Sequence, residues 1–191
     1  ELAKLSINDL MKFKGIGDAK AISIAAALEL GRRRKESETL KKPKVGSSAD
    51  AYEAIRPYLM DLQHEQFWVL LLNRANEVIR PQQISIGGVS GTVADPKMIF
   101  KAAIEHLASA IILVHNHPSG NLEPSEADKV VTDRLIQACK IMQIDIEDHL
   151  IITERSYYSF HSSGLMDELR KSKRFVPAYE QKRQFEEQLA E

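Results

Sequence analysis

The chain has 191 residues, of which 43% are hydrophobic and 28% charged, with a formal net charge of -1. This composition suits one medium-sized domain with a substantial core plus a smaller unit, and the near-neutral charge excludes a strongly basic, nonspecific nucleic-acid binder. The single cysteine, Cys139, excludes an internal disulfide and is typical of a cytoplasmic protein. Since no apolar stretch approaches the roughly 20 residues of a membrane span, we expect no membrane partner.

Residues 1–31 show the pattern of two helices joined by a tight glycine turn. We expect the first helix to follow an N-cap at Ser6 and the second to run from Asp18 to a C-cap at Gly31. Because the chain starts without methionine inside an expected helix, we also expect that further sequence precedes it. The following residues, 32–46, are rich in lysine and arginine, which predicts an exposed basic linker.

The turn between these two helices carries a candidate DNA-binding surface. Gly15 and Gly17 allow positive φ angles and the close approach of a partner, and backbone N–H groups at the start of the next helix can hold a phosphate. Lys14 and Lys20 add positive charge beside them. This pattern predicts weak, sequence-independent DNA binding. The alternative is a plain helical hairpin whose glycines only allow a tight turn.

Residues 47–166 alternate between helix-like and strand-like patterns, which predicts an α/β domain with a mixed central β-sheet flanked by helices. We expect helices over residues 51–62, 95–107 and 126–142, and strands over residues 67–72, 77–80, 84–93, 108–114, 144–153 and 157–160. After this domain comes a charged C-terminal tail, residues 167–191, for which we expect helical or frayed structure.

The strongest sign of function is the His-Asn-His-Pro-Ser-Gly string at residues 115–120, directly after an apolar strand. Side chains two residues apart lie on the same face of a strand, so we expect His115 and His117 to point the same way. Two neighbouring imidazoles at a rigid strand end provide half of a tetrahedral zinc site. Pro118 ends the strand, and the following Ser-Gly pair turns the chain.

Asp128 is the candidate third ligand. It lies in the first turn of the helix expected to begin near Ser125, from which its carboxylate can reach back to the strand end. The same Ser125-x-x-Asp128 spacing is also a common capping box, and the two interpretations can hold at once. Three protein ligands leave a fourth position for water, which is the arrangement of a catalytic rather than a structural zinc site.

A hydrolase also needs a group that accepts a proton from the attacking water and passes it to the leaving group. Glu65 is the preferred candidate because it lies just ahead of a hydrophobic strand, while Glu123 and Glu126 remain alternatives. Ser125 has a second candidate role, since its hydroxyl can donate a hydrogen bond to the oxygen that becomes negative on a carbonyl under attack.

Taken together, Glu65, His115-x-His117 and Ser125-x-x-Asp128 resemble the JAMM, or MPN-plus, metalloprotease signature. The longer string around the two histidines resembles the RadC family in particular. The resemblance covers about residues 6–165 and implies an MPN/JAMM-like fold over the sheet-forming part, with layers arranged as in cytidine deaminases. Further matches are Gly91-Thr92, Asp148-His149 and, as a helix-hairpin-helix segment, residues 1–31.

The resemblance implies roles for individual residues. It implies that His115, His117 and Asp128 bind one zinc ion, that Glu65 is the general acid and base, and that Ser125 stabilises the oxyanion. We therefore expect a zinc metallopeptidase that hydrolyses a peptide or isopeptide bond in an unidentified protein or peptide substrate. The alternative is a DNA-associated repair or recombination accessory protein that binds DNA through its helix-hairpin-helix segment and has little or no peptidase activity.

Overall fold

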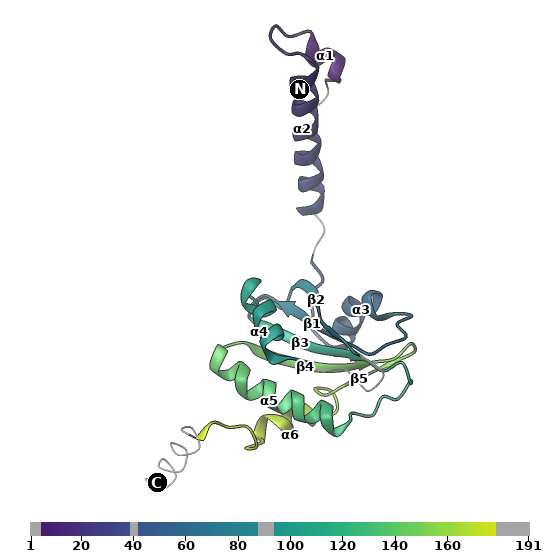
Figure 1. Ribbon diagram of the computed structural model, residues 1–191, viewed down its shortest axis with the longest axis vertical. Coiled ribbons are helices and arrows are strands. Elements are labelled where there is room, and N and C mark those ends of the chain that lie inside the picture. The colour runs from purple at the N-terminus through teal and green to yellow at the C-terminus, as the bar shows by residue number, and fades with distance from the viewer. Residues whose placement is uncertain (1–4, 39–41, 88–93, 179–191) are drawn as a thin grey trace. The chain divides into compact units, whose positions relative to one another are not determined.

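The computed structural model describes residues 5–38, 42–87 and 94–178. The chain divides into two compact units, a helical unit up to Lys41 and a sheet unit from Lys42 onward (Figure 1). Among the described residues, no helix combines the length and apolar character that a membrane span requires.

The helical unit consists of α1 (Ile7–Met11) and α2 (Asp18–Glu38). The Ser6 side chain accepts a hydrogen bond from the main-chain N–H of Asp9 and completes a capping box, which confirms the expected N-cap. Between the helices the chain turns at Gly15, whose φ of 88° lies in the left-handed region that favours glycine.

The expected end of the second helix at Gly31 is wrong, because α2 runs straight through this glycine. Glu29 forms ion pairs of 2.8 Å with both Arg32 and Arg33, on the far side of the glycine. Such pairs stabilise a helix by about 0.2–0.5 kcal/mol each, which offsets part of the roughly 1 kcal/mol that glycine costs in a helix interior. Residues 32–38, the first part of the segment expected as an exposed linker, are therefore helical.

The sheet unit is built on a mixed, five-stranded sheet with the strand order β2-β1-β3-β4-β5. Strands β3 and β4 run parallel, and the other neighbouring strands run antiparallel. This arrangement confirms the expected mixed sheet. The strands are β1 (Gln66–Leu72), β2 (Val78–Ile86), β3 (Ala110–Asn116), β4 (Asp145–Ile152) and β5 (Tyr157–Ser159).

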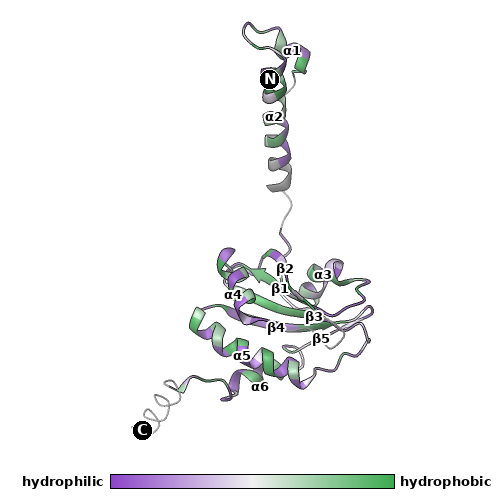
Figure 2. Cartoon of the chain, viewed as in Figure 1, coloured by the Kyte–Doolittle hydropathy of each residue, from purple (hydrophilic) through white to green (hydrophobic). Residues whose placement is uncertain are grey.

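Helices cover both faces of this sheet (Figure 1). On one face α3 contributes Ile55 to a core that includes Ile112 of β3. On the other face α4 and α5 contribute Ile99 and Leu135 to a core that includes Leu113 of the same strand. Figure 2 shows the apolar residues along β1 and β3 that make both cores possible. The helices are α3 (Ser48–Leu59), α4 (Pro96–Glu105), α5 (Glu126–Met142) and α6 (Leu165–Lys171).

The expectation of two separate strands over residues 77–80 and 84–93 is wrong, because β2 is one continuous strand from Val78 to Ile86. This strand contains Pro81, which has no N–H to donate. Proline is tolerated there because β2 lies at an edge of the sheet. Residues 88–93, and with them the glycine-threonine step, lie outside the described residues.

The basic segment expected as a linker over residues 32–46 ends inside the sheet unit. Val45 is buried, and its main-chain N–H donates to the carbonyl oxygen of Asn76 at 2.8 Å. At the other end of the unit, the predicted charged tail begins at Asp167 inside α6, one residue after the buried Met166. Residues 179–191 of this tail lie outside the described residues.

Candidate metal centre

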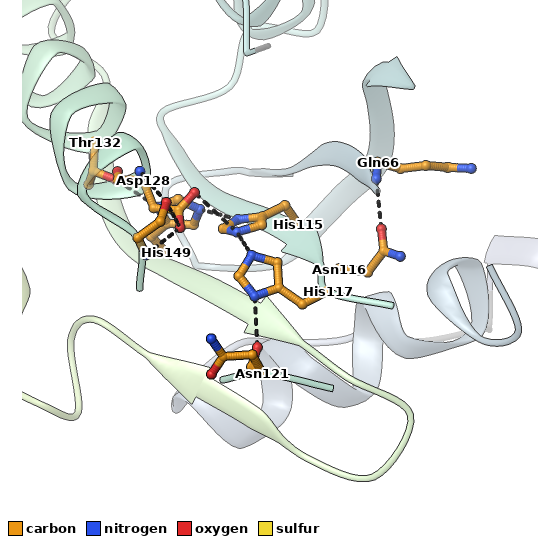
Figure 3. A network of polar contacts seen from close by, with 9 residues as sticks. Gln66, His115, Asn116, His117, Asn121, Asp128, Thr132 and His149 are labelled. Atoms are coloured by element: carbon orange, nitrogen blue, oxygen red, sulfur yellow. Dashed lines mark hydrogen bonds and ion pairs between the residues drawn. The ribbon is translucent and has the colours of Figure 1, made fainter. Parts of the chain in front are cut away.

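Three polar side chains converge at the C-terminal end of β3 (Figure 3). His115 lies on β3, His117 directly follows it, and Asp128 lies in the first turn of α5. The Nε2 atom of His115 is 2.9 Å from Nε2 of His117 and 3.3 Å from Oδ1 of Asp128. One candidate ligand atom from each residue lies within 4.8 Å of the other two. The structure therefore brings together the three ligands predicted from the sequence.

The turn after β3 orients the ring of His117. The main-chain N–H of Gly120, at a φ of 80°, donates to the carbonyl oxygen of His117 at 3.0 Å. This turn carries the carbonyl oxygen of Asn121 to 2.7 Å from Nδ1 of His117. A carbonyl oxygen can only accept, so Nδ1 carries the proton, and in the neutral ring Nε2 presents its lone pair to the cluster.

A capping box orients the carboxylate of Asp128. The hydroxyl of Ser125 donates to Oδ2 of Asp128 at 2.6 Å, and the main-chain N–H of Ser125 donates to the same oxygen at 2.8 Å. Oδ2 is thereby occupied, and Oδ1 is the oxygen that faces His115. The predicted capping box is confirmed, and the cap is what aims Asp128 at the histidines. In this structure the Ser125 proton lies on the bond to Asp128.

The environment keeps Asp128 ionised. Partial burial opposes ionisation, but the neighbouring His115 and the hydrogen bonds from Ser125 outweigh it and hold the pKa of Asp128 well below its usual range. An anionic oxygen and imidazole nitrogens that share one small volume form a donor set suited to a divalent cation. The residues present therefore fit the zinc ion that the sequence motif predicts.

His149, on β4, lies beneath His115 and is fully buried. Its Nε2 is 2.8 Å from Nδ1 of His115, and its Nδ1 is 2.6 Å from the hydroxyl oxygen of Thr132 on α5. Burial, with smaller contributions from His115 and His117, lowers the pKa of His149 well below its usual range, although Asp128 acts in the opposite direction. His149 is therefore a neutral support for the ring of His115 and not a fourth ligand.

Glu65, the predicted general base, directly precedes β1 and lines a cavity of about 290 Å³ beside the three converging side chains. His115 and Asp128 line the same cavity, and most of its remaining wall is apolar. The alternatives fit less well: Glu123 is exposed, and Glu126 forms surface ion pairs. Of the three candidate glutamates, Glu65 is the one that lines this cavity.

Asn116 was not among the residues predicted to matter. Its Oδ1 accepts from the main-chain N–H of Gln66 at 2.7 Å, and its Nδ2 donates to the carbonyl oxygen of His64 at 3.1 Å. These two bonds fix the main chain on both sides of Glu65. The sequence contains one signal for this role, because Asn116 is a polar residue at the end of an otherwise apolar strand. Once buried, such a side chain requires hydrogen-bond partners.

The residues predicted to contact DNA belong to the helical unit. Gly15 adopts the positive φ expected of it, whereas Gly17 does not. Lys14 and Lys20 are exposed, and the ammonium group of Lys20 donates to the carbonyl oxygen of Gly15 at 3.0 Å. DNA contact by these residues stays a prediction.

Comparison with known proteins gives a consistent family assignment. The RadC-like JAB domain family matches residues 45–165. A protein of Flavobacterium johnsoniae named "UPF0758 protein" is 51% identical over 164 residues, which cover 86% of this chain and 72% of the relative. Relatives of the same name from Porphyromonas gingivalis and Pelodictyon phaeoclathratiforme are 45% and 44% identical, and the aligned regions cover 86% and 87% of this chain and 74% of each relative. The family match includes every residue of the candidate metal centre.

Proposed function

The chain belongs to the family of RadC-like JAB domain proteins, and from this premise we propose that it is a zinc-dependent hydrolase that cleaves a peptide or isopeptide bond. The observation that carries the proposal is the convergence of two imidazole nitrogens and an ionised carboxylate next to a cavity that Glu65 lines. Such a constellation, with a candidate base within the same cleft, is what metal-assisted hydrolysis requires.

His115, His117 and Asp128 hold the ion in this proposal. Two imidazoles and a carboxylate favour zinc over the hard cations magnesium and calcium, which prefer ligands that are all oxygen. When bound, zinc supplies a Lewis acid and lowers the pKa of water. The protein residues contribute the charge, the orientation and the proton transfer.

Glu65 accepts a proton from the attacking water and delivers it to the nitrogen of the leaving group. The apolar wall of the cavity, which includes Phe67 and Val131, excludes bulk water and strengthens electrostatic interactions within it. Ser125 stabilises the negative oxygen that develops on the substrate carbonyl. For that role its hydroxyl must exchange its present acceptor, Oδ2 of Asp128, for the substrate oxygen.

The test is a comparison of cleavage products. Wild-type protein and Glu65→Gln are incubated with a bacterial cell extract, and new peptide termini are identified by mass spectrometry. Glu123→Gln is the matched control, because Glu123 is an exposed glutamate near the same motif. We expect new termini with the wild type and the control, and none with Glu65→Gln or after removal of the metal. Identical termini from Glu65→Gln contradict the assigned base.

DNA binding by the helical unit is a second candidate function. It is supported by the exposed Lys14 and Lys20 side chains close to the left-handed turn at Gly15. Backbone N–H groups at the start of α2 add to the attraction for a phosphate. We expect duplex DNA binding that weakens as salt rises, survives Glu65→Gln and is lost in the double variant Lys14→Ala, Lys20→Ala. Unchanged binding by the double variant contradicts this surface.

A further inference from the structure

A chain of short contacts connects two of the proposed metal ligands through the interior (Figure 3). The hydroxyl of Thr132 donates to the main-chain carbonyl oxygen of Asp128 at 2.6 Å. The same hydroxyl oxygen lies 2.6 Å from Nδ1 of His149. Nε2 of His149 in turn lies 2.8 Å from Nδ1 of His115. The contacts therefore run from the main chain of Asp128 to the ring of His115.

The donor and the acceptor of every hydrogen bond in this series of contacts follow from the first contact, between Thr132 and Asp128. A carbonyl oxygen only accepts, and a hydroxyl has one proton, so the proton of Thr132 lies on the bond to Asp128. The Thr132 oxygen must then accept a proton from Nδ1 of His149. A neutral His149 that carries its proton on Nδ1 has a lone pair on Nε2, which accepts from Nδ1 of His115. The neutral ring of His115 is left with an unprotonated Nε2.

Burial prevents water from changing the arrangement of protons along these contacts. Thr132 and His149 have no measurable solvent exposure, and the ring of His149 packs against Phe160 with ring centroids 4.6 Å apart. The reversed order leaves two oxygens, of Thr132 and Asp128, 2.6 Å apart without a proton between them. It also places a proton on Nε2 of His115, the atom that faces the other two ligand groups, and a protonated nitrogen cannot bind a metal ion.

We infer that Thr132 and His149 are positioning residues that set the tautomer of His115, so that its Nε2 is available to a metal ion. The inference rests on the proposed function for the identity of the ligands. Partners that hold the second nitrogen of a metal-binding histidine fix its tautomer and orientation, and their loss typically costs about 10–100-fold in metal affinity. Here the partner is a second buried histidine, which is oriented by a hydroxyl on the helix that carries Asp128.

The first test reads the tautomer directly in the wild-type protein. Long-range proton–nitrogen correlation spectra of protein labelled with nitrogen-15 distinguish a protonated Nδ1 from a protonated Nε2 in a neutral histidine. We expect His149 to carry its proton on Nδ1 in both the metal-free and the zinc-loaded protein. A proton on Nε2 of His149 overturns the inference, whether or not zinc binds.

The second test removes the hydroxyl while keeping the shape of the side chain. We expect Thr132→Val to weaken zinc binding about 10–100-fold, and Thr132→Ser, which keeps the hydroxyl, to bind zinc as the wild type does. Circular dichroism and thermal unfolding verify that both variants fold. Equal zinc affinity of Thr132→Val and Thr132→Ser contradicts the inference alone, whereas failure of the wild type to bind zinc contradicts the proposed function.

Discussion

The side chain of Asn116 sets the position of Glu65 through the main chain. Its amide accepts a hydrogen bond from the residue after Glu65 and donates one to the residue before it. Asn116 also lies between the two histidines of the proposed metal centre. One side chain thus ties the proposed base to the strand that carries two of the proposed ligands.

We therefore expect Asn116→Ala to lower kcat by about 100-fold, because displacement of a catalytic group by about 1 Å has a cost of this order. Zinc affinity should change little, since neither ligand histidine bonds to the Asn116 side chain. Steady-state kinetics and a zinc titration measure the two effects. Asn121→Ala is the control and should keep the kcat of the wild type. Asn121 orients His117 through its main-chain carbonyl, which alanine retains. Wild-type kcat in Asn116→Ala contradicts this role.

Gly120→Ala should weaken zinc binding. The φ of 80° at Gly120 costs a non-glycine residue roughly 1–2 kcal/mol, and relief of that strain moves the Asn121 carbonyl away from His117. Gly31→Ala is the matched control: Gly31 lies inside α2, and an added Cβ meets nothing within 4 Å. Alanine there should stabilise the helix by up to about 1 kcal/mol. Equal zinc affinity of both variants contradicts the role of the turn.

Ser125→Ala separates capping from catalysis. Loss of the cap should destabilise the protein by about 1 kcal/mol, and loss of an oxyanion donor should lower kcat about 100–1,000-fold even at saturating zinc. Ser6→Ala is a matched control, because Ser6 and Asp9 form the same capping box with the same 2.6 Å hydroxyl contact in the helical unit. A kcat of Ser125→Ala that recovers fully when zinc is saturating contradicts an oxyanion role.

Cys139 gives a prediction about pH. Burial, assisted by the charge of Asp145, raises the pKa of the thiol from 9.0 to about 12. The folded protein therefore keeps the thiol neutral while the unfolded chain ionises it, so this group's contribution to stability is full below pH 9.0 and is lost as pH rises toward 12. The stability gap between wild type and Cys139→Ala should narrow by about 1 kcal/mol between pH 8 and pH 10 in urea unfolding. A difference in stability between the two proteins that stays constant over this pH range contradicts the raised pKa of the Cys139 thiol.

The parts of the site that were predicted from the sequence depend on short-range geometry. His115 and His117 are two residues apart at a strand end, and Ser125 and Asp128 have the spacing of a capping box. These patterns fix the direction of a side chain within one turn or one strand repeat. The connection between β3 and α5 then only has to lead the chain back to the strand end, which brings Asp128 to the two histidines.

The contacts that local patterns do not place, those of His149 and Asn116, depend on strand register. His149 reaches His115 because β4 lies beside β3 in parallel, with Leu113 opposite His149. Asn116 reaches the main chain around Glu65 because β1 pairs antiparallel with β3, with Phe67 opposite His115. Local patterns do not specify which strands become neighbours. The continuation of α2 through Gly31 was also not predicted, because glycine is a typical stop signal and the ion pairs of Glu29 across it offset only part of its cost.

The central claim is that His115, His117 and Asp128 jointly hold one metal ion, and a zinc titration with a competing chromophoric chelator tests it most directly. We expect about one zinc per wild-type chain, and in His117→Ala and Asp128→Asn a loss of affinity larger than the about 10–100-fold that removal of a supporting residue costs, because each variant removes one of three protein ligands. His161→Ala, which removes an exposed histidine outside the cluster, should bind as the wild type does. A folded wild type that binds no zinc, or unchanged affinity in both ligand variants, contradicts the account.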